Sequence, residues 1–131
     1  MNEIMVKDEV VVSRSHIEEI RLQPQNRLDL EGGEWLQQQL KAIAPRRYKT
    51  WVIDFSDVEF IDSFGLFSLV SGLNLATESD ARLVLCSLRP SARLIFEITQ
   101  LDRVFHISES YDVLLTIAPS ESATPVLRIV D

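Results

Sequence analysis

Hydrophobic residues follow two patterns along this chain: short continuous runs, and stretches in which they recur every three to four positions. Continuous runs rich in Val, Ile and Leu are typical of buried strands. They predict strands at residues 9–12, 17–22, 50–55, 82–86 and 104–107. The periodic stretches are typical of amphipathic helices. They predict helices at residues 28–44, 63–73, 90–101 and 111–117.

The alternation of strands with helices predicts an α/β fold. The first two strands, separated by Ser13-Arg14-Ser15-His16, fit an antiparallel pair. The later strands are apolar on both faces, which is typical of parallel strands covered by helices. The expected architecture is therefore a mixed, mostly parallel sheet of four to five strands flanked by about four helices.

The chain length of 131 residues fits a single domain. We assign residues 1–117 to this domain and residues 118–131 to a C-terminal tail, because Pro119 and Pro125 interrupt regular structure there. The apolar run at 126–130 has two open interpretations, an edge strand or a contact with a partner chain.

The helical periodicity also predicts which side chains face the core. Gly32 and Gly33 mark the entrance of the first helix. The apolar stripe of the second helix consists of Leu66, Leu69, Val70 and Leu73. The apolar face of the third helix consists of Leu94, Ile95, Ile98 and Leu101. Residues 56–59, between the strand at 50–55 and the second helix, are expected to form a loop.

The formal net charge is −7 and the pI is near 4.8, which argues against nucleic acid as a partner, because such binding needs basic residues to neutralise phosphates. The sequence has no apolar run of membrane-spanning length and no visible signal peptide. We therefore expect a cytoplasmic location and no contact with a membrane. Cys86 is the only cysteine, which excludes a disulfide within the chain. Its apolar neighbours indicate a small buried hydrophobe.

Catalytic chemistry finds no support in the motifs. Glycine-rich phosphate loops and the GxSxG elbow of hydrolases are absent, and the two histidines lack metal-ligand spacing. Four carboxylates gather within nine residues, but the acidic pair and late lysine of a magnesium-binding receiver domain are missing. These carboxylates are Asp54, Asp57, Glu59 and Asp62. The chain is therefore expected to be no enzyme, with no catalytic residue, metal or cofactor.

The most informative residues are Asp62 and Ser63, immediately before a strongly periodic helix. Either side chain can cap the helix by accepting a backbone N–H of its first turn. A hydroxyl at a helix N-terminus is also a favourable position for a phosphate, because the unpaired N–H groups favour an anion. The row Gly65, Ser68 and Gly72 allows close approach of another backbone, either from a partner or from the chain's own sheet.

Two stretches of the chain resemble a STAS domain of the bacterial anti-sigma factor antagonist type. They read VIDFSDVEFIDSFG and RLVLCSLRPSARLIFEITQLDRVFHI. The family pattern is a strand ending in Asp, a short loop, a Asp-Ser-x-Gly motif opening a helix, and a later Leu-Asp-x-Val-Phe-like stretch, matched at 101–105. The similarity spans roughly residues 16–117.

This resemblance implies a phosphoregulated switch in a partner-switching pathway. Ser63 matches the serine that an anti-sigma factor with serine kinase activity phosphorylates, and that a metal-dependent serine phosphatase restores. The unphosphorylated form binds the anti-sigma factor, with Asp54, Asp62, Ser63 and Phe64 on the docking face. Such a protein is expected to be a monomer or a weak homodimer. The alternative is a non-switching structural or scaffold STAS subunit of a larger signalling assembly.

The sequence departs from the family pattern at four positions. Phe64 and Phe67 replace small residues in the motif helix, where a ring beside Ser63 either enlarges a partner contact or blocks it. Gln100 and Gln25 stand where glycine is usual. Because a non-glycine residue is strained at positive φ, the turn at Gln100 is expected to differ.

Overall fold

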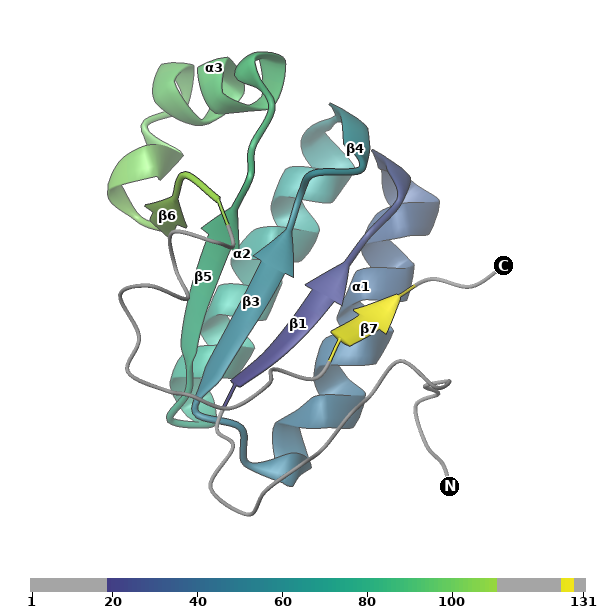
Figure 1. The fold of residues 1–131 in the computed structure, drawn as a ribbon, viewed down its shortest axis with the longest axis vertical. Helices are drawn as coiled ribbons and strands as arrows, with labels where there is room; N and C mark the ends of the chain where they lie inside the picture. Colours follow the sequence, from purple (N-terminus) through teal and green to yellow (C-terminus); the bar gives the residue numbers. More distant parts are fainter. Residues whose placement is uncertain (1–18, 111–125, 129–131) are drawn as a thin grey trace.

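Five strands form the main sheet of the computed structural model, which describes residues 19–110 and 126–128 (Figure 1). The strand order is β6-β5-β3-β1-β7, and every neighbouring pair in this sheet is parallel. The strands are β1 (Glu19–Gln23), β3 (Thr50–Asp54), β5 (Arg82–Cys86), β6 (His106–Ser108) and β7 (Val126–Arg128). The α/β class and the mostly parallel sheet are thus confirmed.

Both faces of the central strands are buried, as their apolar sequences predict. Trp51 and Ile53 of β3 belong to the main core, whereas Val52, between them in sequence, packs with Val84 and Cys86 of β5 in a second cluster. Side chains alternate between the two faces of a strand, so the two clusters lie on opposite faces of the sheet.

Two long helices, α1 (Leu30–Ile43) and α2 (Ser63–Glu78), cover one face of the sheet and lie behind it in Figure 1. They pack closely because small residues meet at their contact. A Cβ added at Gly33 would lie 3.0 Å from Ser68, and one added at Gly72 would lie 2.6 Å from Leu40 Cδ1. In the small-residue row of α2, Ser68 and Gly72 therefore face α1, whereas Gly65 faces the Leu28 carbonyl oxygen of β2.

The predicted stripe of α2 is confirmed in part. Leu69 is fully buried, and Leu66, Val70 and Leu73 pack against the core while remaining partly exposed. The most buried face of this helix is instead made largely of small residues. These are Gly65, Ser68, Gly72 and Ala76.

A second, two-stranded sheet was not predicted. Its strands are β2 (Asn26–Leu28) and β4 (Val58–Ile61), which pair in parallel. The prediction of a loop over 56–59 is thus wrong for its second half. The run Val58–Ile61 has its two middle residues exposed and its two ends buried, so it lacks the alternation that marks a strand in sequence.

The face predicted for the third helix, α3 (Pro90–Ile98), is wrong for Leu94 and Ile98, whereas Leu101, which follows the helix, packs against the core. Leu94 and Ile98 are 54% and 71% exposed, whereas Ala92 and Phe96 are buried. Phe96 packs edge-to-face on Phe105, with ring centroids 5.7 Å apart and planes at 77°. Because α3 carries apolar residues on both sides, its inward face is decided by this aromatic contact.

The tail and the termini complete the comparison with the predictions. The run at 126–130 contributes β7, which pairs with β1 at the edge of the sheet, so the edge-strand interpretation is confirmed. The strand expected at 9–12, the antiparallel partner of the run at 17–22, and the helix expected at 111–117 lie outside the described residues.

The turn at Gln100 keeps the left-handed conformation despite lacking glycine. Gln100 has φ 63° between α3 and a short 3-10 helix, η2 (Leu101–Arg103). The expectation of a different turn is thus wrong. Near Gln25 the positive φ falls on the next residue, Asn26, which tolerates this conformation better than most residues.

Candidate functional site

The candidate site begins where β3 ends, at Asp54. This side chain is buried, and its residue is 4% exposed. Asp54 Oδ1 accepts the backbone N–H of Ser56 at 2.9 Å, and Oδ2 lies 3.8 Å from Arg21 Nη1. Asp54 therefore stabilises the loop after β3 through its hydrogen bond with Ser56. Because it is buried, it exposes little surface to a partner.

The same loop is held from two further directions. Gln23, at the end of β1, donates through Nε2 to Ser56 Oγ at 3.2 Å and to Asp57 Oδ2 at 3.3 Å. Arg89, at the start of α3, donates through Nη2 to the Ser56 carbonyl at 3.0 Å. The loop that leads into β4 and α2 is thus fixed by hydrogen bonds to β1, β3 and the start of α3.

Asp62 is the residue that caps α2. Its Oδ1 accepts the backbone N–H groups of Phe64 at 3.0 Å and Gly65 at 3.1 Å. Of the two capping candidates in the sequence, the structure thus selects Asp62. Ser63 is the first residue of the helix, and it is exposed. Its hydroxyl is not required for the cap.

Exposed aromatic rings accompany Ser63. Phe64 is 55% exposed and Phe67 is 66% exposed, three positions apart and therefore on adjacent turns of one helix side. Phe60 of β4 is 41% exposed, and the guanidinium carbon of Arg27 lies 4.2 Å from its ring centroid. All three rings belong to residues 60–67, the segment in which β4 leads into α2.

Asp29 plays the same part at α1 that Asp62 plays at α2. Its Oδ1 accepts the backbone N–H of Gly32 at 3.1 Å, and its Oδ2 lies 3.2 Å from Arg27 Nε. The hydrogen bond from Gly32, together with that from Arg27, lowers the pKa of the Asp29 carboxyl. The Gly32-Gly33 pair lies inside the first turn, so Asp29 marks the helix entrance more directly than the glycines do.

The predicted site residues thus divide into two sets. Asp62, Ser63 and Phe64 adjoin one another at the start of α2, whereas Asp54 belongs to the buried network with Arg21. Sequence reasoning missed Arg27 and Phe60, which stand opposite each other in the β2–β4 register. No sequence signal identified that pairing, because neither strand was predicted.

Neither a metal-binding cluster nor a membrane-spanning helix is present among the described residues. Among residues 19–110 and 126–128, no group of three His, Cys, Asp or Glu side chains is arranged to hold a metal ion. In the same part of the chain, no helix is both long and apolar enough to cross a bilayer. His106 of β6 has its Nε2 3.0 Å from Arg82 Nη2.

Comparison with solved structures supports the antagonist resemblance. A protein of Thermotoga maritima described as an anti-sigma factor antagonist is 23% identical, with a TM-score of 0.71 over 79% of this chain and 89% of that chain. An anti-sigma factor antagonist from Mycobacterium paratuberculosis is 26% identical, with a TM-score of 0.65 over 82% and 91%. The phosphorylated form of the Bacillus cell fate determinant SpoIIAA is 14% identical, with a TM-score of 0.60 over 83% and 99%.

The family comparison extends over most of the sequence. The family model described as "STAS domain" matches residues 13–113, which include every described helix and all strands except β7. The resemblance noted from the motif around Ser63 is thereby confirmed. This chain belongs to the STAS domain family.

Proposed function

We propose that this chain is a phosphoregulated anti-sigma factor antagonist in a partner-switching pathway. It binds an anti-sigma factor that is also a serine kinase while Ser63 is unphosphorylated, and a metal-dependent serine phosphatase restores this form. It acts in the cytoplasm as a binding protein and not as an enzyme. The similarity to two proteins described as anti-sigma factor antagonists supports the class of partner.

One observation carries the proposal: Ser63 is exposed while Asp62 performs the capping. A phosphate on Ser63 therefore leaves the helix cap intact. The phosphate adds about −1.5 to −2 charges at pH 7 next to the Asp62 carboxylate. Because the fold keeps its cap, the new charge acts mainly on a docked partner. The phosphorylated form of the similar SpoIIAA supports this assignment of a modification.

The four proposed partner-binding residues take different roles. Asp62, Ser63 and Phe64 meet the partner directly, because they adjoin one another at the exposed start of α2. Asp54 acts as a positioning residue, since it is buried and holds the Ser56 loop through a hydrogen bond of 2.9 Å. The Phe64 ring adds apolar contact area beside the serine.

The test begins with the native protein. Peptide mass spectrometry on cells taken in growth and under stress is expected to find Ser63 phosphate whose stoichiometry changes with condition. Affinity capture with Ser63→Ala as bait is expected to recover an anti-sigma factor kinase, which then serves as the titrant in calorimetry. Ser63→Ala is expected to bind it like the native chain, and Ser63→Glu at least about tenfold more weakly, a change of about 1.4 kcal/mol.

Ser91→Glu is the matched control, because Ser91 is another exposed serine in the first turn of a helix, α3. It is expected to leave the affinity unchanged. Equal affinity of Ser63→Ala and Ser63→Glu would overturn the switch. A Ser63 that stays unmodified in every condition would instead favour the non-switching scaffold subunit.

A further inference from the structure

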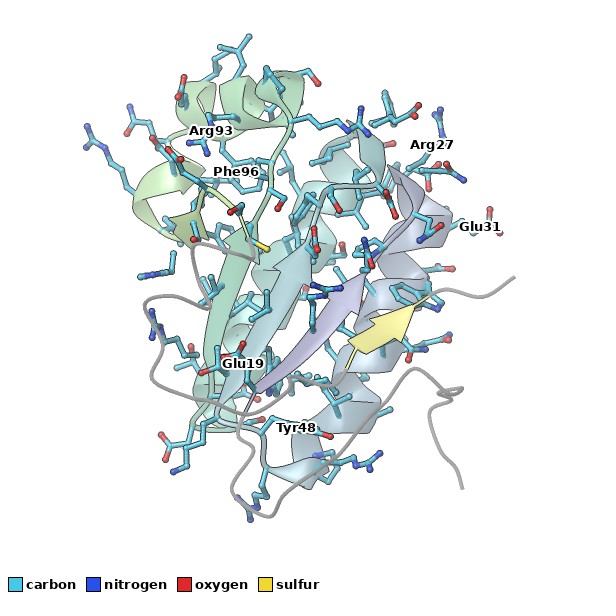
Figure 2. The ribbon with its side chains drawn as sticks, viewed as in Figure 1. Glu19, Arg27, Glu31, Tyr48, Arg93 and Phe96 are labelled. Carbon is cyan, nitrogen blue, oxygen red and sulfur yellow. The ribbon has the colours of Figure 1, made fainter. Side chains whose placement is uncertain are left out.

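Phe67 carries the most exposed aromatic ring among the described residues for which burial is given, 19–110, at 66% exposure. It lies outside the buried face of α2, which includes its next neighbours Ser68 and Leu69. Arg27, labelled at the upper right of Figure 2, lies over the ring of Phe60. The Phe67 ring makes no comparable aromatic or cation–π contact within residues 19–110. Neither the core nor a partner ring or cation of this region therefore accounts for a ring at position 67.

The Phe67 ring is a surface neighbour of Ser63. The two residues are four positions apart in α2, and side chains at this spacing lie on one side of a helix with Cβ atoms about 5–6 Å apart. Phe64 is three positions before Phe67 and therefore adjoins the same side. All three residues are exposed. A partner that reaches the Ser63 hydroxyl thus meets the Phe67 ring on the next turn of the helix.

The residues around Phe67 hold its position relative to the rest of the chain. A Cβ at Gly65 would overlap the Leu28 carbonyl oxygen, so α2 and β2 are in backbone contact there. A Cβ at Gly33 of α1 would lie 3.0 Å from the Cβ of Ser68, the next residue along α2. The helix therefore cannot turn to carry the ring away from the serine. Because the position of the ring is fixed before binding, little ordering is required when a partner covers it.

We propose that Phe67 determines how tightly the anti-sigma factor kinase binds this chain, through insertion of its ring into an apolar recess of the kinase beside the position that receives Ser63. The inference rests on the proposed function, which supplies the partner. A ring beside the serine has two possible effects, enlarging a partner contact or blocking it. Exposure favours the first, because a ring that blocked access would cover Ser63, and Ser63 is exposed.

The role of Phe67 is in binding and not in phosphoryl transfer. Its side chain is a hydrocarbon ring one helical turn from Ser63, so it neither donates nor accepts a proton there. An aromatic side chain buries about 150–250 Å² when it is covered, which makes it a typical anchor of an interface. The contact is the same before and during transfer, so its loss raises KM and leaves kcat unchanged. The ring thus sets the affinity, and the charge state of Ser63 sets the switch.

The test measures affinity by calorimetry with the anti-sigma factor kinase that the Ser63→Ala bait recovers. The variants are made in the Ser63→Ala chain, so that phosphorylation does not interfere. Phe67→Ser is expected to weaken binding at least about tenfold, a change of about 1.4 kcal/mol. Phe67→Leu keeps a large apolar side chain and is expected to bind within about threefold of the Ser63→Ala chain. Serine and phenylalanine have similar helix propensities, so α2 is expected to keep its structure.

Ile98→Ser serves as the control, because Ile98 is a similarly exposed apolar residue, at 71%, on α3, the helix that carries Arg93 in Figure 2. It is expected to leave the affinity unchanged. Steady-state assays of transfer of the γ-phosphoryl group of ATP to Ser63 Oγ use the chain with its native serine. There, Phe67→Ser is expected to raise KM about tenfold at unchanged kcat. A lower kcat at unchanged KM would overturn the proposal.

The outcomes separate this inference from the switch. If Phe67→Ser binds like the Ser63→Ala chain while Ser63→Glu binds more weakly, the role of Phe67 is overturned and the switch stands. If Ser63→Ala and Ser63→Glu bind equally while Phe67→Ser binds more weakly, the switch is overturned and the role of Phe67 stands. Equal losses in Phe67→Ser and Ile98→Ser would also overturn the inference, because they would reflect a general loss of exposed apolar surface. A bait that recovers no kinase would overturn both proposals.

Discussion

At the scale of single residues, the cap of α2 depends on Asp62 and not on its neighbour Ser63. Asp62 Oδ1 accepts two backbone N–H groups of α2, whereas the cap does not depend on the Ser63 hydroxyl. Asp62→Ala is therefore expected to lower the free energy of unfolding by about 0.5–2 kcal/mol, the usual cost of losing an N-cap. Ser63→Ala is expected to change it by less than about 0.5 kcal/mol, as at ordinary surface positions. Urea denaturation of both variants checks this, and equal destabilisation would contradict the division of roles.

The candidate site was readable from the sequence only as far as local chemistry reaches. A carboxylate and a hydroxyl before a periodic helix predict a cap, and α2 has one. Which of the two side chains provides it was left open by the sequence. The burial of Asp54 was not readable, because a carboxylate at a strand end can point to solvent or turn inward to a cation. Its environment depends on Arg21, which is 33 positions away in sequence and meets it only through the pairing of β1 with β3.

At the scale of elements, the packing of α2 against β2 and α1 depends on two glycines that differ in what surrounds them. A Cβ at Gly65 would overlap the Leu28 carbonyl oxygen, a backbone atom that cannot move alone. A Cβ at Gly72 would meet only the end of the Leu40 side chain. Gly65→Ala is thus expected to cost about 1–3 kcal/mol of unfolding free energy, as overpacked sites do. Gly72→Ala is expected to cost clearly less, since Leu40 can rotate and alanine favours the helix by up to about 1 kcal/mol.

Thermal or urea unfolding of the two alanine variants measures this difference. Both substitutions add one methyl group to the same helix, so each serves as the control for the other. A larger loss for Gly72→Ala than for Gly65→Ala would show that side-chain crowding at Leu40 of α1, and not backbone contact at Leu28 of β2, limits how closely α2 packs.

Sequence periodicity located elements better than it oriented them. The β-branched run of β3 and the apolar run of β5 were predictable because strands buried on both faces have continuous apolar sequences. The inward face of α3 was not, since Leu94, Ile98 and Phe96 are all apolar and only the tertiary contact of Phe96 with Phe105 selects one side. β2 and β4 were not predicted for a similar reason. Each is four residues or shorter, and each is stabilised by pairing with the other strand and not by a hydrophobic pattern of its own.

At the scale of the whole molecule, Cys86 links folding to pH. It is buried on β5, in the cluster on the face of the sheet opposite α1 and α2. Burial, and secondarily the negative charge of Asp54, raise the pKa of the Cys86 thiol from 9.0 to about 12. The native state therefore favours the neutral thiol more than the unfolded chain does. The resulting stability is fully present below pH 9 and is lost as the pH rises from about 9 towards 12.

Other groups also titrate in this range, so the prediction concerns a difference between two proteins. Cys86→Ala removes the thiol and is expected to lower the unfolding free energy by a fixed amount for the lost sulfur contacts, which are independent of pH. The difference in unfolding free energy between the native chain and Cys86→Ala is then expected to be constant from pH 7 to 9 and to shrink from pH 9 to 10.5. The reason is that in this range the thiol of the native chain ionises more readily in the unfolded state, which lowers its unfolding free energy, whereas Cys86→Ala has no thiol to ionise. Urea titrations at these pH values measure the gap. A gap that stays constant to pH 10.5 would mean that Cys86 ionises as readily in the folded protein as in the unfolded chain, and that solvent reaches this face of the sheet.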